Sequence, residues 1–269
     1  MAMPRRLIDT VDHAGRAEGF EDGGALHERT RRASIRSPRR GIGAACRKAR
    51  LANGLPAGVL QRGLSLGRAL FVDALPSFYD DLDGFRAEGW RRLAEGVTNR
   101  HSPFHTPSLA TVDAAGRPRL RTVVLRAADA GAGALRFHCD RRSDKAQEIA
   151  ANGLAALHVY DGRAKLQLRI EGRAHLHQDD AVADAAWGAA LTMSRICYGV
   201  EPAPGTALTA GDAYTMPDED PEARIGRENF CAVVLSAERL DLLYLDRRGH
   251  RRAVFRRGTE TWTGTWVAP

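Results

Sequence analysis

The sequence lacks the features of a membrane protein, a metal site or a repeat protein. No apolar run approaches the roughly 18 residues that a membrane-spanning helix needs, so we expect no membrane partner. The four cysteines form no Cys-x-x-Cys pair and none is paired with histidine at metal-site spacing, so we expect no metal and a reducing cytoplasm. No internal repeat is present.

The excess positive charge is confined to the front of the chain. Residues 1–75 contain 14 Lys+Arg and 7 Asp+Glu, whereas the remaining 194 residues contain 26 of each. A neutral remainder has no long-range field to attract a polyanion, so the basic pI of about 9.7 does not predict nucleic-acid binding by the folded part. That remainder is long enough to bury a single core.

Residues 1–75 lack the apolar periodicity of a folded domain, and we predict a disordered basic extension. Three interpretations stay open: a basic arm for nucleic acid or membrane, a targeting peptide, or sequence translated from upstream of the true start. Acids such as Asp9 and Glu18 interrupt any targeting helix. We favour a start near Val72, because Arg, Gly, Ala and Pro are what GC-rich codons yield in any frame.

From residue 77 the pattern becomes that of a β-rich domain. Helical spacing predicts an amphipathic helix over 78–97, and alternation predicts a hairpin of strands 108–113 and 120–125. The other predicted strands are 135–139, 154–160, 164–177, 230–236, 240–245, 253–256 and a last strand that contains Trp262 and Trp266. Two more helices are predicted, at 144–151 and 179–191. A long Pro/Gly-rich loop follows the second of them. Many short antiparallel strands with few flanking helices predict a closed or split β-barrel over residues 77–269.

The stretch from Arg119 to Lys145 has the strongest sign of a binding site. Alternation puts Arg119 and Arg121 on a strand face otherwise used for apolar packing, where a guanidinium needs an anion. Ser143, at a predicted helix start, and Lys145 add a hydroxyl, a cation and free backbone N–H groups, a combination that suits phosphate. The alternative is that a carboxylate on a neighbouring strand satisfies Arg121, Lys145 is solvated and Ser143 only caps the helix.

These motifs resemble those of the pyridoxamine 5'-phosphate oxidase-like family of FMN-binding split barrels. The run Arg121-Thr-Val-Val-Leu-Arg126 is similar to the family's Arg-x-Val-Leu-Leu-Lys, and residues 137–139 and 143–146 are similar to its Phe-Tyr-Thr and Ser-Arg-Lys-Ala. Residues 165–172 fit the strand with its flavin-contacting glutamine. The resemblance covers roughly residues 77–269 and is to a divergent branch, not to the vitamin B6 enzyme itself.

The resemblance implies FMN as cofactor and a role for individual residues. Arg121, Ser143 and Lys145 would hold its phosphate, and Gln167 would hydrogen-bond the isoalloxazine ring. The expected FMN contacts are Arg121, Thr122, Val123, Val124, Leu125, Arg126, His138, Cys139, Ser143, Lys145 and Gln167. The substrate-side candidates are Arg126, Ser194, Arg195 and Arg251, while no catalytic residue is assigned and no metal is implied.

The resemblance also implies a homodimer with FMN at its interface and an FMN-dependent, oxidase-like oxidoreductase. Hydride would pass to or from flavin N5 on a small-molecule substrate. Asp144 stands where the family has a phosphate-binding arginine, and Ala253 where its substrate motif has a histidine, which argues against vitamin B6 as substrate. Two alternatives stay open: a non-enzymatic flavin-binding protein, and a split-barrel reductase using a nicotinamide or deazaflavin cofactor.

Overall fold

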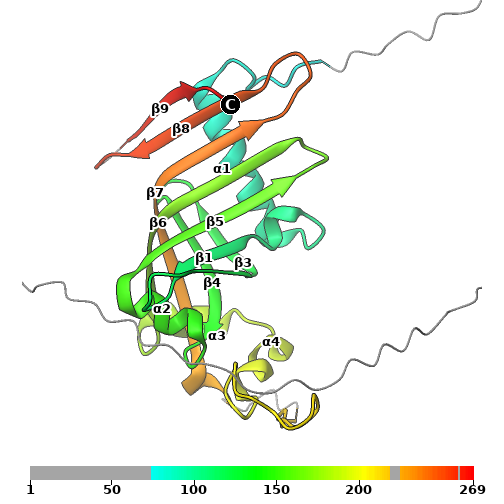
Figure 1. Cartoon of the computed structure of the whole chain (residues 1–269), viewed down its shortest axis with the longest axis vertical. Helices are drawn as coiled ribbons and strands as arrows, with labels where there is room; N and C mark the ends of the chain where they lie inside the picture. The colour runs from blue at the N-terminus through cyan, green and yellow to red at the C-terminus, as the bar shows by residue number, and fades with distance from the viewer. Residues whose placement is uncertain (1–73, 219–224, 260) are drawn as a thin grey trace, which may run out of the picture. The chain divides into compact units, whose positions relative to one another are not determined.

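The computed structural model describes residues 74–218, 225–259 and 261–269 (Figure 1). The predictions for the N-terminal extension, including a start near Val72, lie outside the described residues. The helices are α1 (Leu82–Thr98), α2 (Asp144–Asn152), α3 (Ala181–Gly188) and α4 (Thr192–Ile196), with short 3-10 turns η1 (Pro103–His105), η2 (Cys197–Gly199) and η3 (Arg227–Asn229). The strands are β1 (Ser108–Val112), β2 (Pro118–Thr122), β3 (Leu125–Asp129), β4 (Ala134–Asp140), β5 (Leu154–Asp161), β6 (Leu166–His177), β7 (Phe230–Tyr244), β8 (Arg251–Arg257) and β9 (Trp262–Val267).

The nine strands of the described residues belong to one antiparallel sheet, which curls into a barrel. The strand order is β2-β1-β5-β6-β7-β4-β3, with β8 paired to β7 and β9 to β8. Strands β2 and β3 lie at opposite ends of this order, yet only Val123 and Val124 join them. Because so short a link spans about 10 Å at most, the two edges must meet. The predicted split-barrel class is confirmed.

This closure corrects the predicted strand over 120–125. The chain pairs with β1 as far as Thr122 and with β4 from Leu125 onward, so the run is divided between two strands. The Val123 N–H leaves the ladder and donates to the Pro107 carbonyl at 3.0 Å. Periodicity did not predict the break, because both halves keep the same alternation and Val123 and Leu125 are both buried.

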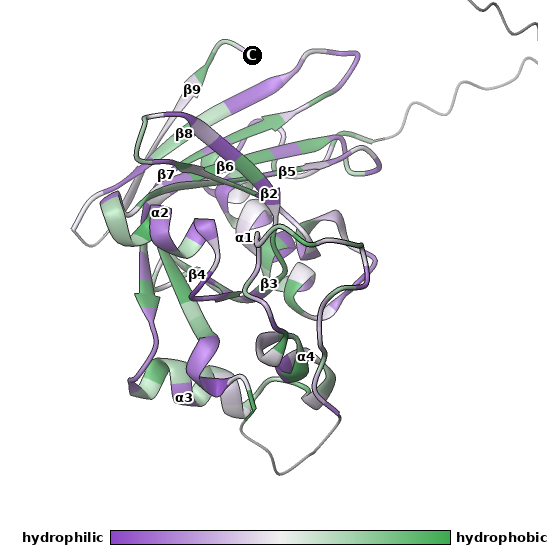
Figure 2. Ribbon diagram, turned by 60° about the horizontal axis from the view of Figure 1, so that its bottom comes forward, coloured by the Kyte–Doolittle hydropathy of each residue, from purple (hydrophilic) through white to green (hydrophobic). Residues whose placement is uncertain are grey.

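The barrel interior is filled by every second residue of the long strands. Along β6, Leu166, Leu168 and Ile170 are buried, whereas Gln167 and the residues alternating with it are half-buried and face outward. Figure 2 shows this as green and purple bands along the strands. The inner face therefore forms the hydrophobic core and the outer face carries polar side chains.

Strand β7 is one continuous strand of 15 residues, so the prediction of two strands, 230–236 and 240–245, is wrong. The chain bends near Ser236 and Ala237 instead of turning, at the β-bulge between Glu171 and Gly172 of β6. A Cβ on Gly172 would lie 2.0 Å from the Ser236 carbonyl oxygen, so only glycine lets the two strands approach so closely. The bend lets β7 pair with β4 in its first half and with β8 in its second (Figure 1).

The helices begin and end at residues that satisfy their free backbone groups. Helix α1 begins at Leu82, later than predicted, because the Asp81 carboxylate accepts the Asp83 N–H at 3.1 Å. Helix α2 ends at Asn152, one residue beyond the predicted range of 144–151, and Gly153 after it takes the left-handed conformation (φ 68°) and accepts the Ala174 N–H at 2.7 Å. The predicted helix 179–191 corresponds to the shorter α3, and α4 follows it as a separate helix that was not predicted. None of the described helices is long and apolar enough to cross a membrane.

A fully buried carboxylate, Asp241, joins three neighbouring strands on the outer face. It accepts hydrogen bonds from Arg169 of β6 at 2.5 Å, Arg239 of β7 at 2.9 Å and Arg252 of β8 at 3.0 Å. Burial alone would raise the pKa of Asp241, but the hydrogen bonds and charges of the arginines outweigh it and lower the pKa below its usual value. The carboxylate is therefore ionised at neutral pH.

We expect Asp241→Asn to destabilise the fold by about 2–4 kcal/mol at pH 7, because it leaves three arginines without their shared anion. The difference in free energy of unfolding between the variant and the native protein should shrink as pH falls through the lowered pKa of Asp241, because the native carboxylate then loses its charge too. Urea denaturation followed by circular dichroism measures both. Asp212→Asn, in an exposed loop, is the control. Equal stabilities for the two variants would contradict the role of Asp241.

Candidate cofactor site

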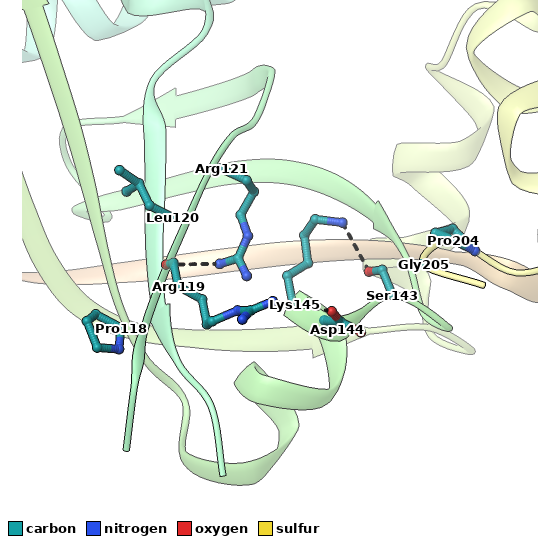
Figure 3. Close-up of a pocket in the computed structure, with 9 residues that line it drawn as sticks. All are labelled: Pro118, Arg119, Leu120, Arg121, Ser143, Asp144, Lys145, Pro204 and Gly205. Carbon is teal, nitrogen blue, oxygen red and sulfur yellow. Dashed lines mark hydrogen bonds and ion pairs between the residues drawn. The ribbon is translucent and has the colours of Figure 1, made fainter. Parts of the chain in front are cut away.

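A pocket of about 520 Å³ lies between β2 and the first turn of α2 (Figure 3). Its lining residues are Pro118, Arg119, Leu120, Arg121, Ser143, Asp144, Lys145, Pro204 and Gly205. Three of these are cations and one is an anion. In Figure 3 the side chains of Arg119, Arg121 and Lys145 gather between the strand and the helix. The pocket is thus built for a negatively charged ligand.

Arg121 is held in place by a carboxylate behind the pocket. Its Nη2 donates to Glu148 of α2 at 2.7 Å, and its Nη1 donates to the hydroxyl of Thr111. Thr111 in turn donates to Glu148 at 2.5 Å. The carboxylate that we considered as an alternative partner therefore exists, on a helix instead of a strand. A guanidinium has five N–H donors, and no described residue accepts from the Arg121 Nε–H, so this donor can bind a ligand.

Glu148 is ionised although its side chain is only 7% exposed. Burial tends to raise its pKa, but hydrogen bonds from Thr111 and Arg121, together with the charges of Arg121 and Arg119, lower it below the usual value. A stable anion here fixes the position of the Arg121 guanidinium before any ligand arrives.

The start of α2 offers hydrogen-bond donors to the pocket. Ser143 occupies the N-cap position, as predicted, but its side chain makes no capping bond. Its hydroxyl donates to the Asp140 carbonyl at 2.6 Å and accepts from Lys145 Nζ at 3.1 Å. Among the described residues, the backbone N–H groups of Asp144 and Lys145 have no hydrogen-bond partner. Free N–H groups at a helix N-terminus, beside the cations Arg119, Arg121 and Lys145, fit a phosphate group.

One wall of the pocket comes from the long loop after α4. Arg142 donates to Asp140 at 2.8 Å and to the Val200 carbonyl at 2.9 Å, and also forms an ion pair with Glu201. These contacts fasten the loop to the turn before α2. Pro204 and Gly205, a few residues further on, then line the pocket. The long Pro/Gly-rich loop thus contributes to the site.

The other predicted FMN contacts on β2, β3 and β4 fall into buried and exposed groups. Val123, Leu125 and Cys139 are buried in the core, where they support the site from behind. Thr122 is exposed and Val124 is half-buried. Their contacts with FMN stay predictions.

Arg126 and His138 lie near one another, and neither lines the pocket. Arg126 sits at a β-bulge of β3, and its side chain makes no hydrogen bond or ion pair with another described residue. His138 packs edge-on against Phe230, with ring centroids 4.8 Å apart. Burial, with the charges of Arg136 and Arg126, lowers the pKa of His138 to about 4, so the imidazole is neutral at physiological pH.

Gln167 and Arg251 lie apart from the pocket. Gln167 points to the outer face of the barrel, whereas Arg121 shares the inward face of Leu109, with which it pairs. Arg251 is bound to Asp80 at 2.7 Å, with its guanidinium 3.9 Å from the centroid of the Tyr79 ring. The fold of this chain therefore does not bring these two residues to the pocket, and their roles stay predictions.

Ser194 and Arg195 lie on α4, beside an aromatic cluster of Trp187, Tyr198 and Phe230. Arg195 donates to the Gly188 carbonyl at 2.8 Å, and its guanidinium is 5.3 Å from the centroid of Trp187. The Ser194 side chain makes no hydrogen bond with another described residue. The cluster forms a small second core against the first half of β7.

Comparison with known proteins identifies the domain. Residues 87–178 match the family model described as the pyridoxamine 5'-phosphate oxidase, FMN-binding domain. Residues 87–178 are therefore an FMN-binding domain of the pyridoxamine 5'-phosphate oxidase type. Its cofactor is accordingly FMN, and the phosphate-binding features of the pocket fit this assignment.

Two relatives show how far the likeness extends. Pyridoxine/pyridoxamine 5'-phosphate oxidase 2 of Arabidopsis thaliana is 27% identical over 201 residues, which cover 69% of this chain and 100% of that protein. Pyridoxine/pyridoxamine 5'-phosphate oxidase of Cereibacter sphaeroides is 34% identical over 110 residues, or 41% of this chain and 52% of that protein. The match thus spans the whole length of the first relative and about half the length of the second.

Two solved structures share the fold. A pyridoxamine 5'-phosphate oxidase-related, FMN-binding protein from Nostoc punctiforme is 27% identical with a TM-score of 0.54, covering 73% of this chain and 100% of that one. PhzG from Burkholderia lata, solved in complex with tetrahydrophenazine-1-carboxylic acid, is 20% identical with a TM-score of 0.54, covering 74% and 99%. The second likeness concerns the fold alone.

Sequence reasoning did not assign four residues that shape the pocket: Thr111, Arg119, Arg142 and Glu148. Alternation did put Arg119 on the same strand face as Arg121, and this signal could have marked it. The Arg121–Glu148 ion pair joins residues that are 27 positions apart in the sequence, and the Arg142–Glu201 ion pair joins residues that are 59 positions apart. No local pattern predicts such pairs.

We expect His138 to make stability fall as pH drops from about 6.5 to 4. Its pKa is lowered from 6.5 to about 4 in the native state, so the unfolded chain binds more protons across this window. His138→Phe keeps the ring contact with Phe230 and should remove on the order of 2–3 kcal/mol of this loss. Urea denaturation at pH 7.5 and pH 4 without added flavin measures it, with exposed His101→Phe as control. Parallel pH profiles for all three proteins would contradict the assignment.

Proposed function

We propose that this protein is an FMN-dependent oxidoreductase that acts on a small molecule. The observation that carries the proposal is the convergence of Arg121, Lys145 and the free N–H groups of α2 on one pocket of an FMN-binding family domain. When bound, FMN supplies the two-electron chemistry at its N5 atom, and the protein supplies binding, orientation and electrostatic tuning.

The phosphate-binding end is organised before ligand binding. Glu148 and Thr111 fix the Arg121 guanidinium, while Ser143 orients the Lys145 ammonium. Charge-assisted hydrogen bonds from preorganised cations lose little conformational entropy when the ligand arrives. These residues thus anchor the cofactor and set the position of its ring without reacting themselves.

The substrate side is best placed around Arg126. It is a half-buried cation that has no anionic partner among the described residues, and it lies close enough to His138 to lower the pKa of that imidazole. A small anionic substrate would supply the missing charge. Vitamin B6 is a poor candidate, since Ala253, the counterpart of a substrate-binding histidine, is fully buried and apolar.

We also propose a homodimer with FMN at its interface, in a reducing cytoplasm. Gln167 lies on the outer face of the barrel, whereas Arg121 lies on the inner face. Gln167 can therefore hydrogen-bond the flavin of a partner subunit. Beside it on that face lies Tyr160, its cross-strand neighbour, which is 49% exposed, with Leu154 of the same strand at 50%. Two exposed apolar side chains on one face of β5 fit a surface that a partner covers.

An absorbance spectrum followed by anaerobic reduction tests the function. The purified protein, or the protein reconstituted with FMN, should be yellow. Donors to compare are pyridoxamine 5'-phosphate, reduced nicotinamides, reduced deazaflavin and small anionic reductants. Bleaching by an organic donor, with turnover in oxygen, supports an oxidase. Turnover with reduced nicotinamide or deazaflavin supports a reductase, and no turnover with any donor supports flavin binding without catalysis.

Arg121→Ala should weaken FMN binding by roughly ten- to a hundredfold, because one charge-assisted contact to phosphate is worth on the order of 1.5–3 kcal/mol. Titration of the apoprotein followed by flavin fluorescence measures the dissociation constant. Arg117→Ala is the control, since Arg117 is exposed on the same hairpin and pairs with Asp113. Unchanged affinity in the Arg121 variant would reject its role.

Tyr160→Arg should shift the protein from dimer to monomer, because it places a charge on the proposed interface beside Gln167. Tyr214→Arg is the matched control: Tyr214 is 48% exposed, but it lies in the long loop off the sheet. Size-exclusion chromatography with light scattering measures the mass. A monomeric native protein, or a dimer that Tyr160→Arg leaves intact, would count against this interface.

A further inference from the structure

We propose that Arg119 is a third phosphate-binding cation of the cofactor pocket and that Asp144 competes with the phosphate for it. This inference rests on the proposed function, because it concerns the same pocket. It adds a residue that determines specificity: Arg119 would favour a flavin with a phosphomonoester over the same flavin without one.

The position of Arg119 supports a direct contact. It lines the pocket two residues before Arg121 on β2, so both side chains leave the same face of the strand. Figure 3 shows its side chain extended toward Asp144 and Lys145 at the start of α2. A phosphate held by Arg121 and Lys145 would therefore lie within reach of Arg119.

Arg119 is only loosely held by its present partners. Its Nη2 is 3.8 Å from Asp144 Oδ2 and its Nε is 3.7 Å from Glu148 Oε1, both beyond hydrogen-bond distance. Its side chain is 46% exposed. Glu148, by contrast, is bound closely by Arg121 at 2.7 Å. Arg119 is thus the cation of the pocket that can turn toward a new anion at little cost.

A phosphate offers Arg119 a better partner than either carboxylate does. Its oxygens can accept short hydrogen bonds of about 2.7–2.9 Å from a guanidinium, often two at once. Asp144 is 66% exposed, so water can solvate it when Arg119 turns away. The Arg119–Asp144 pair then acts as a weak internal contact that the phosphate replaces.

A double-mutant cycle tests the proposal, using titrations with FMN and with riboflavin followed by flavin fluorescence. Arg119→Ala should weaken FMN about tenfold and change riboflavin less than about twofold, because riboflavin has no phosphate. Asp144→Asn should tighten FMN a few-fold by removing the competitor. The double variant should bind FMN as weakly as Arg119→Ala, since the direct contact is absent in both.

The double variant separates this proposal from simple charge neutralisation. If Arg119 only offsets the charge of Asp144, the double variant regains native affinity for FMN, and the proposal is overturned. It is also overturned if Arg119→Ala weakens FMN and riboflavin equally, or no more than Arg117→Ala does. Failure of the proposed function looks different: the native protein then binds FMN no more tightly than riboflavin, and Arg121→Ala has no effect either. Circular dichroism of each variant checks that it is folded.

Discussion

One buried carboxylate, Glu148, organises the cofactor site. It binds Arg121 at 2.7 Å and accepts the Thr111 hydroxyl at 2.5 Å, so helix α2 is tied to both strands of the β1–β2 hairpin. The same contacts lower the pKa of Glu148 and keep it charged. A single anion thus orients the guanidinium and positions the helix N-terminus that faces it. Preorganisation of this kind limits the entropy lost on ligand binding.

Barrel closure places two arginines of one short stretch of chain, Arg121 and Arg126, in different surroundings. Arg121, near the end of β2, faces the phosphate pocket, whereas Arg126, in β3, lies near the neutral imidazole of His138. Only Val123 and Val124 separate the two strands. The crossing that joins the edges of the sheet therefore places one arginine at the phosphate end and the other where we propose that substrate binds.

Much of the fold could be predicted from local pattern. Helix α2 ends within one residue of the predicted range of 144–151, because Gly153 after it tolerates the left-handed conformation (φ 68°) found there. Strand β6 shows the predicted alternation through Ile170. The errors arose where strands change partner. The 120–125 run is divided between β2 and β3, and β7 continues through a bend opposite Gly172, because pairing and close approach to distant strands decide both features.

The sequence by itself determined the barrel class and the FMN-binding domain, and it marked Arg121, Ser143 and Lys145 as candidates for binding an anion, because periodicity, helix-start chemistry and motif spacing are local properties. Only the tertiary structure decided that Glu148 holds Arg121, that Arg142 fastens the long loop over the pocket, and that Gln167 faces away from it. Those relations depend on which distant segments the barrel brings together, and no short stretch of sequence encodes that.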